Sequence, residues 1–305
     1  MNRRQFFQTA AAAATVSRLV AQDDAPKWGT NVIDVHLHPR QQPDAEWTHM
    51  QGCGVTHAVL LTNARAVPHA KEEIAKRPDR LKLFVGVDPG SPDAIETLRS
   101  AVKEGAIGFG EMKSRFKADG PEMMKVYALA AELGVPVTIH FGDVPQFAGD
   151  IAYNEGILRF PAVIKANPKT TFIGHADSFW ANVSAEVQDT AYPSGKIKPG
   201  GVSDKMLTDF PNLYGDMSAN SCRNALGRDP EFMAGFLKRH QDKLMFGSDC
   251  SCRDGRGTGQ GSQAPLIKGK CVARETLTAV KGMVSPEIFR KIAWGNAARL
   301  LKFKA

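Results

Sequence analysis

The chain has 305 residues, of which 43% are hydrophobic and 23% charged, a composition typical of a globular protein with a sizeable core. No stretch approaches the roughly 18 uninterrupted apolar residues that a membrane span requires, and no solenoid-type repeat is present. The net charge of +7 does not indicate nucleic-acid binding, because residues 1–21 carry three arginines and no acid, and without them the charge falls to +4.

Residues 1–21, MNRRQFFQTAAAAATVSRLVA, resemble a twin-arginine export signal. The pair Arg3-Arg4 precedes two phenylalanines and an alanine run. A short amphipathic helix is the alternative. The export interpretation predicts recognition by the twin-arginine export machinery, cleavage near Ala21, and a bacterial protein in the periplasm or outside the cell. Residues 22–30 then form a linker.

Beyond residue 30, short apolar runs alternate with helix-compatible segments. One such segment, 91–105, has Ser91 as its expected N-cap and ends at Gly105. Eight alternating strand signals predict an α/β fold, a (β/α)8 TIM barrel over residues 31–305. A doubly wound open sheet is the alternative, but no Gly-rich phosphate turn follows the first strand. The expected strands are VIDVHLHP, VTHAVLLTN, KLFVGVDP, AIGFGEMK, VPVTIHFG, TTFIGHAD, LYGDMSAN and LMFGSDCS.

Polar side chains stand at the ends of most of these strands, and strand ends converge on one face of a barrel. Imidazoles and carboxylates bind divalent metals such as Zn²⁺, a bound water then ionises near neutral pH, and a nearby carboxylate can move its proton. The pattern therefore predicts a metal-dependent catalytic site, with accidental packing as the alternative. The residues concerned are His36, His38, Glu111, Lys113, His140, His175 and Asp249.

His36-x-His38, His140, His175 and Asp249 resemble the amidohydrolase superfamily, in particular the single-domain branch that contains aminocarboxymuconate-semialdehyde and resorcylate decarboxylases. FIGHADSFW and LMFGSDC are similar to that branch's sixth- and eighth-strand motifs. The resemblance implies that His36, His38, His140 and Asp249 bind a divalent ion, with Zn²⁺ expected and Mn²⁺ or Fe²⁺ as alternatives. It also implies that Asp249 moves a proton, and that His175 orients the substrate or binds a second ion.

Strand four varies within that superfamily, whose binuclear members place a carboxylated lysine or a glutamate there as a bridge. Glu111 is favoured as a metal ligand over Lys113 because it is already an anion; a pairing of the two with nearby residues is the alternative. Inward-facing arginines would favour a carboxylate-bearing small-molecule substrate. The candidate substrate-binding residues are Arg115, Asn220, Arg223 and Arg253.

The expected activity is hydrolysis of a C–N or C–O bond by metal-activated water. The alternatives are a non-oxidative decarboxylase on the same scaffold and a non-catalytic metal-binding protein. The sequence leaves homo-oligomerisation open.

The remaining cysteines and histidines carry weaker signals. Five cysteines are few and odd in number, so no disulfide framework is expected. Cys250 and Cys252 form a C-x-C pair without a second pair, which favours solvent-facing or disulfide-bonded thiols over zinc ligands. Exposed or simply packed positions are expected for His49, His57, His69 and His240.

Overall fold

The structure is a computed structural model that describes residues 26–262 and 265–304. Its eight strands form one parallel sheet in the order β1 to β8. The sheet closes on itself, because the backbone NH of Val35 donates to the carbonyl oxygen of Phe246 at 3.0 Å. The predicted (β/α)8 barrel is therefore confirmed. The strands are β1 (Ile33–Leu37), β2 (His57–Asn63), β3 (Leu81–Gly86), β4 (Gly108–Met112), β5 (Val137–His140), β6 (Phe172–His175), β7 (Leu213–Asp216) and β8 (Leu244–Met245).

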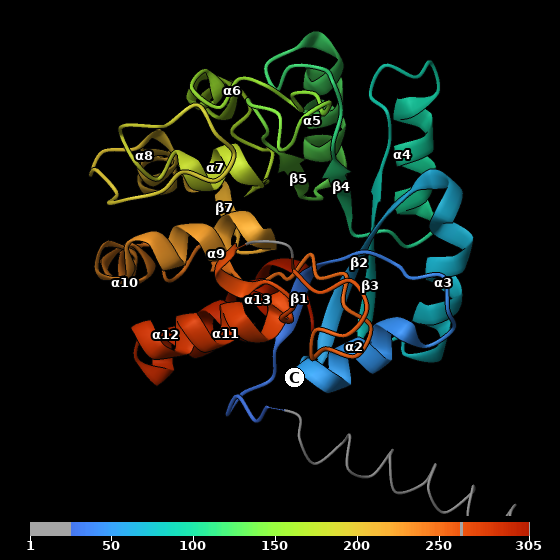
Figure 1. Cartoon of the computed structure of the whole chain (residues 1–305). Coiled ribbons are helices and arrows are strands. Elements are labelled where there is room, and N and C mark those ends of the chain that lie inside the picture. The colour runs from blue at the N-terminus through green and yellow to red at the C-terminus, as the bar shows by residue number, and fades with distance from the viewer. Residues whose placement is uncertain (1–25, 263–264, 305) are drawn as a thin grey trace, which may run out of the picture.

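Helices surround the strands, as Figure 1 shows. They are α2 (Ala45–Cys53), α3 (Val67–Lys76), α4 (Ala94–Lys103), α5 (Pro121–Leu133), α6 (Phe160–Ala166), α7 (Asp177–Ala181), α8 (Val202–Asp209), α9 (Ala219–Arg228), α10 (Pro230–Arg239), α11 (Val272–Met283), α12 (Pro286–Arg290) and α13 (Asn296–Leu301). The predicted cap of α4 is wrong. Asp93 is the N-cap residue, and the carbonyl oxygen of Ser91 accepts from Ala94 in the turn that precedes the helix.

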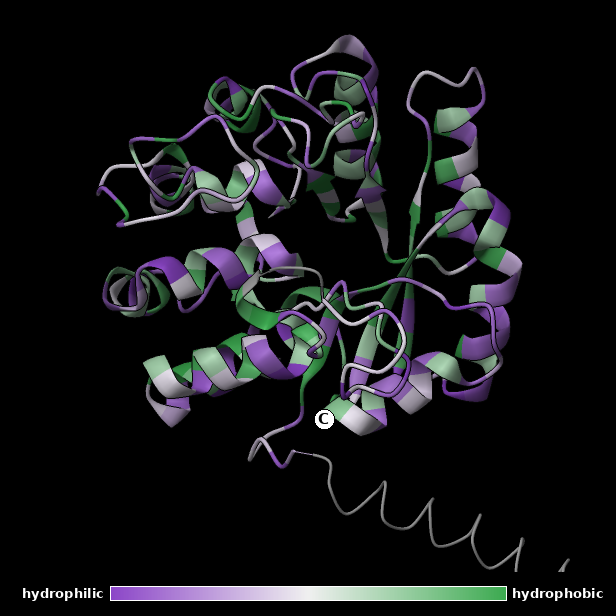
Figure 2. Cartoon of the chain, in the orientation of Figure 1, coloured by the Kyte–Doolittle hydropathy of each residue, from purple (hydrophilic) through white to green (hydrophobic). Residues whose placement is uncertain are grey.

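The strands are apolar because they are covered, and Figure 2 shows hydrophobic strands inside a ring of amphipathic helices. The larger core cluster packs helices against the sheet, and a smaller one joins Ile33, Val35 and Met245 to α13. Burial of each large apolar side chain contributes about 1.5–3 kcal/mol to folding. This packing fixes the strand ends from which the polar side chains project.

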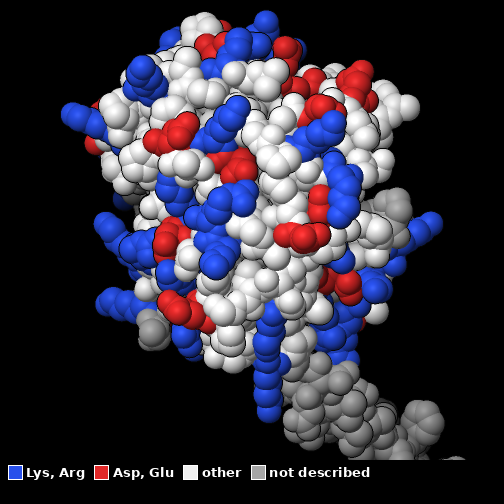
Figure 3. All heavy atoms as spheres, turned by 90° about the vertical axis from the view of Figure 1, so that its left-hand side faces the viewer, with Lys and Arg blue, Asp and Glu red and all other residues white. Residues whose placement is uncertain are grey.

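The described surface is mixed in charge on the face drawn in Figure 3, where basic and acidic side chains alternate. Among the described residues, no helix is long and apolar enough to cross a membrane. The predicted export signal, residues 1–21, lies outside the described residues, as do residues 22–25 of the linker.

Candidate metal centre

His36 of β1 and His38, the residue directly after that strand, face each other at the C-terminal end of the barrel. Nδ1 of the buried His36 lies 2.6 Å from a carboxylate oxygen of Asp216, and Nδ1 of His38 lies 3.0 Å from the carbonyl oxygen of Leu61. Because both partners are acceptors, each neutral imidazole carries its proton on Nδ1. The two Nε2 atoms, only 3.3 Å apart, then present lone pairs to each other. A cation bound between them would remove this repulsion.

Asp216, the last residue of β7, orients a second imidazole as well. The same oxygen, Oδ2, lies 3.2 Å from Nδ1 of His175, and the hydroxyl of Ser218 lies 2.8 Å from that nitrogen. The Nε2 atom of His175 is thereby turned toward the centre of the site. Asp216 is not among the residues predicted from the sequence, although it stands at the same end-of-strand position as the other site residues.

Glu111, on β4, lies among the four imidazoles. Its Oε1 atom is hydrogen bonded to Nδ1 of His140 and lies 3.3 Å from Nε2 of His175. Its Oε2 atom lies 3.6 Å from Nε2 of His38 and 4.0 Å from Nε2 of His36. One carboxylate therefore contacts side chains from three other strands.

Asp249 follows β8 and faces the paired histidines. Its backbone has a φ of 48°, and its NH donates to the carbonyl oxygen of His36 at 2.8 Å. This conformation places Oδ1 at 3.5 Å from Nε2 of His38. The buried Asp34 accepts from the backbone NH groups of His36 and Ser248 at 3.0 and 2.8 Å. Asp34 therefore supports the site by joining β1 to the segment after β8, not by contacting an imidazole.

Two carboxylates of the site, the buried Asp216 and the partly exposed Glu111, are held as anions. Burial would raise the pKa of Glu111 and of Asp216, but hydrogen bonds and charges of the surrounding imidazoles hold both pKa values below their ordinary range. Burial would lower the pKa of His175, whereas its hydrogen bonds to these two carboxylates raise that pKa to about 10. These two anions thus require positive charge, which protonated His175 supplies in the absence of an ion.

The donor set fits a divalent metal in two overlapping ways. His36, His38 and Asp249 each offer a ligand atom within 4.8 Å of the others, and so do His36, Glu111 and His175. His140 belongs to neither group and meets the site through Glu111; its Nε2 atom is buried without a hydrogen-bond partner among the described residues. Nitrogen and carboxylate ligands of this kind suit Zn²⁺, Mn²⁺ or Fe²⁺.

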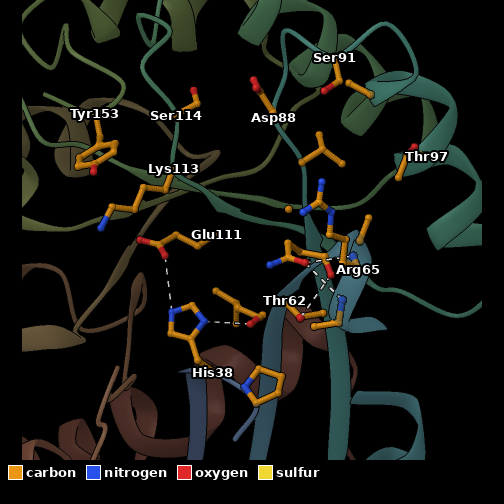
Figure 4. Close-up of a pocket in the computed structure, with 18 of the residues that line it drawn as sticks. His38, Thr62, Arg65, Asp88, Ser91, Thr97, Glu111, Lys113, Ser114 and Tyr153 are labelled. Atoms are coloured by element: carbon orange, nitrogen blue, oxygen red, sulfur yellow. Dashed lines mark hydrogen bonds and ion pairs between the residues drawn. The ribbon is translucent and has the colours of Figure 1, made fainter. Parts of the chain in front are cut away.

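Two cavities open from the site. A small one of about 190 Å³ is lined by Glu111, His140, His175 and Asp249, with Tyr192 and other residues from the surrounding loops. A larger one of about 1270 Å³ shares His38 and Glu111 with it and extends over β2 and β3. Figure 4 shows Glu111 and His38 in this larger cavity, with Lys113 on one side and Arg65 on the other.

The predicted substrate-binding residues are distributed unequally around these cavities. Asn220 lines the small cavity and accepts a hydrogen bond from Ser262 at 2.7 Å. Arg115 lines the larger cavity, whereas Arg223 and Arg253 line neither. Arg65, which also lines the larger cavity, could not be predicted from the sequence, because a cation on the short 3-10 turn after β2 has no distinguishing pattern around it.

The cysteines after β8 and three histidines outside the metal centre are buried. Cys250 and Cys252 are wrongly predicted to be solvent-facing or disulfide-bonded, because both are buried free thiols. The loop that carries them turns inward against α2 instead of facing solvent. His49, His57 and His240 are buried, as the packed alternative expected.

A family model described as Amidohydrolase matches residues 55–173 and 205–303, more than half of the chain. The chain belongs to the amidohydrolase family. This amidohydrolase is therefore an enzyme of the metal-dependent hydrolase or decarboxylase type. Its narrower relation to the aminocarboxymuconate-semialdehyde decarboxylase branch stays a prediction. No curated protein sequence matches the chain.

Solved structures with the same fold share low sequence identity with this amidohydrolase. A probable 2-pyrone-4,6-dicarboxylic acid hydrolase from Acinetobacter baumannii is 16% identical with a TM-score of 0.56, over 90% of this chain and 100% of that one. A 2,6-dihydroxybenzoate decarboxylase from Rhizobium is 16% identical with a TM-score of 0.53, over 90% and 99%. Dihydroorotase from Campylobacter jejuni is 18% identical with a TM-score of 0.52, over 90% and 84%. These likenesses support the fold alone.

Proposed function

We propose that this amidohydrolase cleaves a C–N or C–O bond in a small substrate that carries a carboxylate. One observation carries the proposal: the imidazoles and carboxylates of the site open into a large cavity that is also lined by cations without carboxylate partners. Lys113, Arg115 and Arg65 line that cavity, and none of them forms an ion pair with a described residue. A substrate carboxylate can therefore pair with them without displacing a protein carboxylate.

The site residues have separate roles in this proposal. His36, His38 and Asp249 would hold a divalent ion, for which we propose Zn²⁺, with Glu111 and His175 able to hold a second. When bound, such an ion lowers the pKa of its water toward about 7. Asp249, which is partly exposed to the small cavity, accepts a proton from the attacking water and returns it to the leaving group. Asp216 keeps His36 and His175 oriented.

The names of two neighbours specify carboxylate-bearing compounds, a pyrone dicarboxylic acid and a dihydroxybenzoate. Because those likenesses are of fold, the cations of this chain are the stronger support. The alternative of decarboxylation uses the same cluster and differs in the bond that breaks.

The test is a panel of lactones, esters and amides, each with and without a carboxylate, assayed with metal-loaded enzyme. We expect hydrolysis of carboxylate-bearing members, and a 10- to 100-fold higher KM in Lys113→Ala toward these members only, from the loss of a charged contact. Lys117→Ala, on an exposed position outside both cavities, is the matched control. Release of CO₂ from aromatic carboxylates, without hydrolysis of any panel member, would contradict the proposed hydrolysis and favour decarboxylation.

A further inference from the structure

Three thiols and one imidazole gather in the protein interior beside α2, outside the site described above. Cys250 and Cys252 stand at the start of the loop that follows β8, and Cys271 ends that loop as the N-cap residue of α11. His49 comes from α2. All four side chains are buried, with at most 5% of any residue exposed. Segments more than 200 residues apart in sequence thus bring together four side chains that bind metals.

The distances within this Cys3His cluster (His49, Cys250, Cys252 and Cys271) match a tetrahedral ion. Sγ of Cys250 lies 3.4 Å from Sγ of Cys252 and 3.8 Å from Sγ of Cys271, and Sγ of Cys252 lies 3.5 Å from Nδ1 of His49. Zinc bonds of about 2.3 Å to sulfur and about 2.0–2.1 Å to nitrogen give tetrahedral edges of about 3.8 Å between sulfurs and about 3.6 Å between sulfur and nitrogen. All four ligand atoms lie within 4.8 Å of one another.

The charge around the cluster also favours a thiolate-bound metal. The Arg40 guanidinium donates to the carbonyl oxygens of Cys250 and Cys252 at 2.6 and 3.1 Å. Arg40 forms no ion pair with a described residue, and its Nη1 atom is buried without a hydrogen-bond partner. Three thiolates around a divalent ion carry one net negative charge, which would balance this partly buried cation.

The carbonyl oxygen that the His49 imidazole contacts has a second hydrogen-bond donor. Nδ1 of His49 lies 3.0 Å from the carbonyl oxygen of Cys252 as well as near the thiol. If Nδ1 binds a metal, that carbonyl keeps its hydrogen bond from Arg40. We propose that the Cys3His cluster is a second, structural metal site that binds Zn²⁺ through three thiolates and Nδ1 of His49.

The proposed ion would hold the loop after β8 against α2. The backbones already meet closely, since a Cβ added to Gly52 would lie 1.7 Å from the carbonyl oxygen of Asp254. Ligands at both ends of the loop, Cys250 and Cys271, close it into a metal-clipped ring. Cys250 directly follows Asp249, so the ion would also fix the backbone that carries this catalytic side chain. The cluster is therefore expected to position Asp249 without touching substrate.

The test is metal analysis of the full chain purified under reducing conditions, followed by cobalt substitution. We expect the wild-type chain to bind one more metal ion than the Cys252→Ser chain. Thiolate-to-cobalt charge-transfer absorption should appear in wild type, persist in His38→Asn, and vanish in Cys252→Ser. Cys222→Ser removes a buried thiol outside the cluster and is the matched control. Since the catalytic site contains no sulfur, this absorption reports the Cys3His cluster alone.

Thiol counting in denaturant on wild-type protein provides a second measurement that does not depend on the folding of any variant. We expect five reactive thiols after chelation in denaturant. In the native protein, we expect at least three thiols to be protected until chelator is added. A disulfide joining two cysteines of the cluster in the purified protein would overturn the proposal. So would cobalt-loaded wild type without thiolate absorption.

Discussion

Replacing Asp216 by Asn tests whether this carboxylate keeps the imidazole protons of His36 and His175 on Nδ1. In the wild type, one carboxylate oxygen accepts from Nδ1 of His36 at 2.6 Å and lies 3.2 Å from Nδ1 of His175. An amide has no net charge, so both imidazoles lose the anion that favours a proton on Nδ1, and an amide oriented with its NH2 group in this position would donate where the carboxylate accepts. If His36 then moves its proton to Nε2, the nitrogen that faces His38 can no longer bind a metal.

The size of the effect follows from the role of such outer partners. Loss of a carboxylate that orients a metal-binding histidine typically weakens metal affinity or activity 10- to 100-fold, or about 1.4–2.8 kcal/mol. We expect a loss of this size in Zn²⁺ affinity, measured by chelator competition, and a parallel fall in kcat/KM at limiting metal. Because Asp216 is completely buried, a decrease in stability is also expected.

A matched control separates the two effects. Asp204, on α8, accepts a hydrogen bond at 2.6 Å from the buried His240, which directly follows α10. This Asp–His pair lies away from the candidate metal centre. Asp204→Asn should lower stability and leave metal affinity within twofold of wild type. If Asp216→Asn binds Zn²⁺ as tightly as wild type and keeps its kcat/KM, the proposed orientation of the imidazoles is refuted.

Three further predictions concern catalysis, pH and export. Asp249→Asn should lower kcat by about 10²–10⁴-fold on the true substrate, and near-normal turnover would remove the proton-transfer role. His57 is buried beside Arg80, and both effects lower its pKa to about 4. Its neutral form therefore stabilises the fold fully above about pH 6.5, and up to about 3 kcal/mol of this is lost as the pH falls toward 4. Urea unfolding across this range should show a shallower acid loss in His57→Gln, and identical slopes would contradict the assignment. We propose that the protein is exported, so replacing Arg3 and Arg4 by Lys should leave it in the cytoplasm by cell fractionation; unchanged export would exclude the twin-arginine route.

The barrel could be predicted because its signals are local. Each strand is an apolar run that is buried on both faces, and the ends of such strands meet wherever the barrel closes. His36, His38 and Asp249 therefore come together as their positions in the strands indicate. The choice of Glu111 over Lys113 rested on charge, and the structure places Glu111 against all four imidazoles.

Contacts that depend on loop paths could not be predicted. Asp216 looks like any acidic residue at a strand end until the closed barrel places it behind His36. The C-x-C pair has no second pair in sequence, and its partners, Cys271 and His49, arrive only because the loop after β8 folds back onto α2. The turn before α4 likewise could not be predicted, and because of it the N-cap residue is Asp93 and not the predicted Ser91.

Anomalous diffraction at the zinc edge, from crystals of protein loaded with one equivalent of Zn²⁺ per site, tests the central claim most directly. The account predicts a peak about 2.0–2.1 Å from Nε2 of both His36 and His38, with a carboxylate oxygen of Asp249 or Glu111 completing the coordination. Peaks confined to other parts of the molecule, with these two Nε2 atoms hydrogen bonded to water, would contradict it.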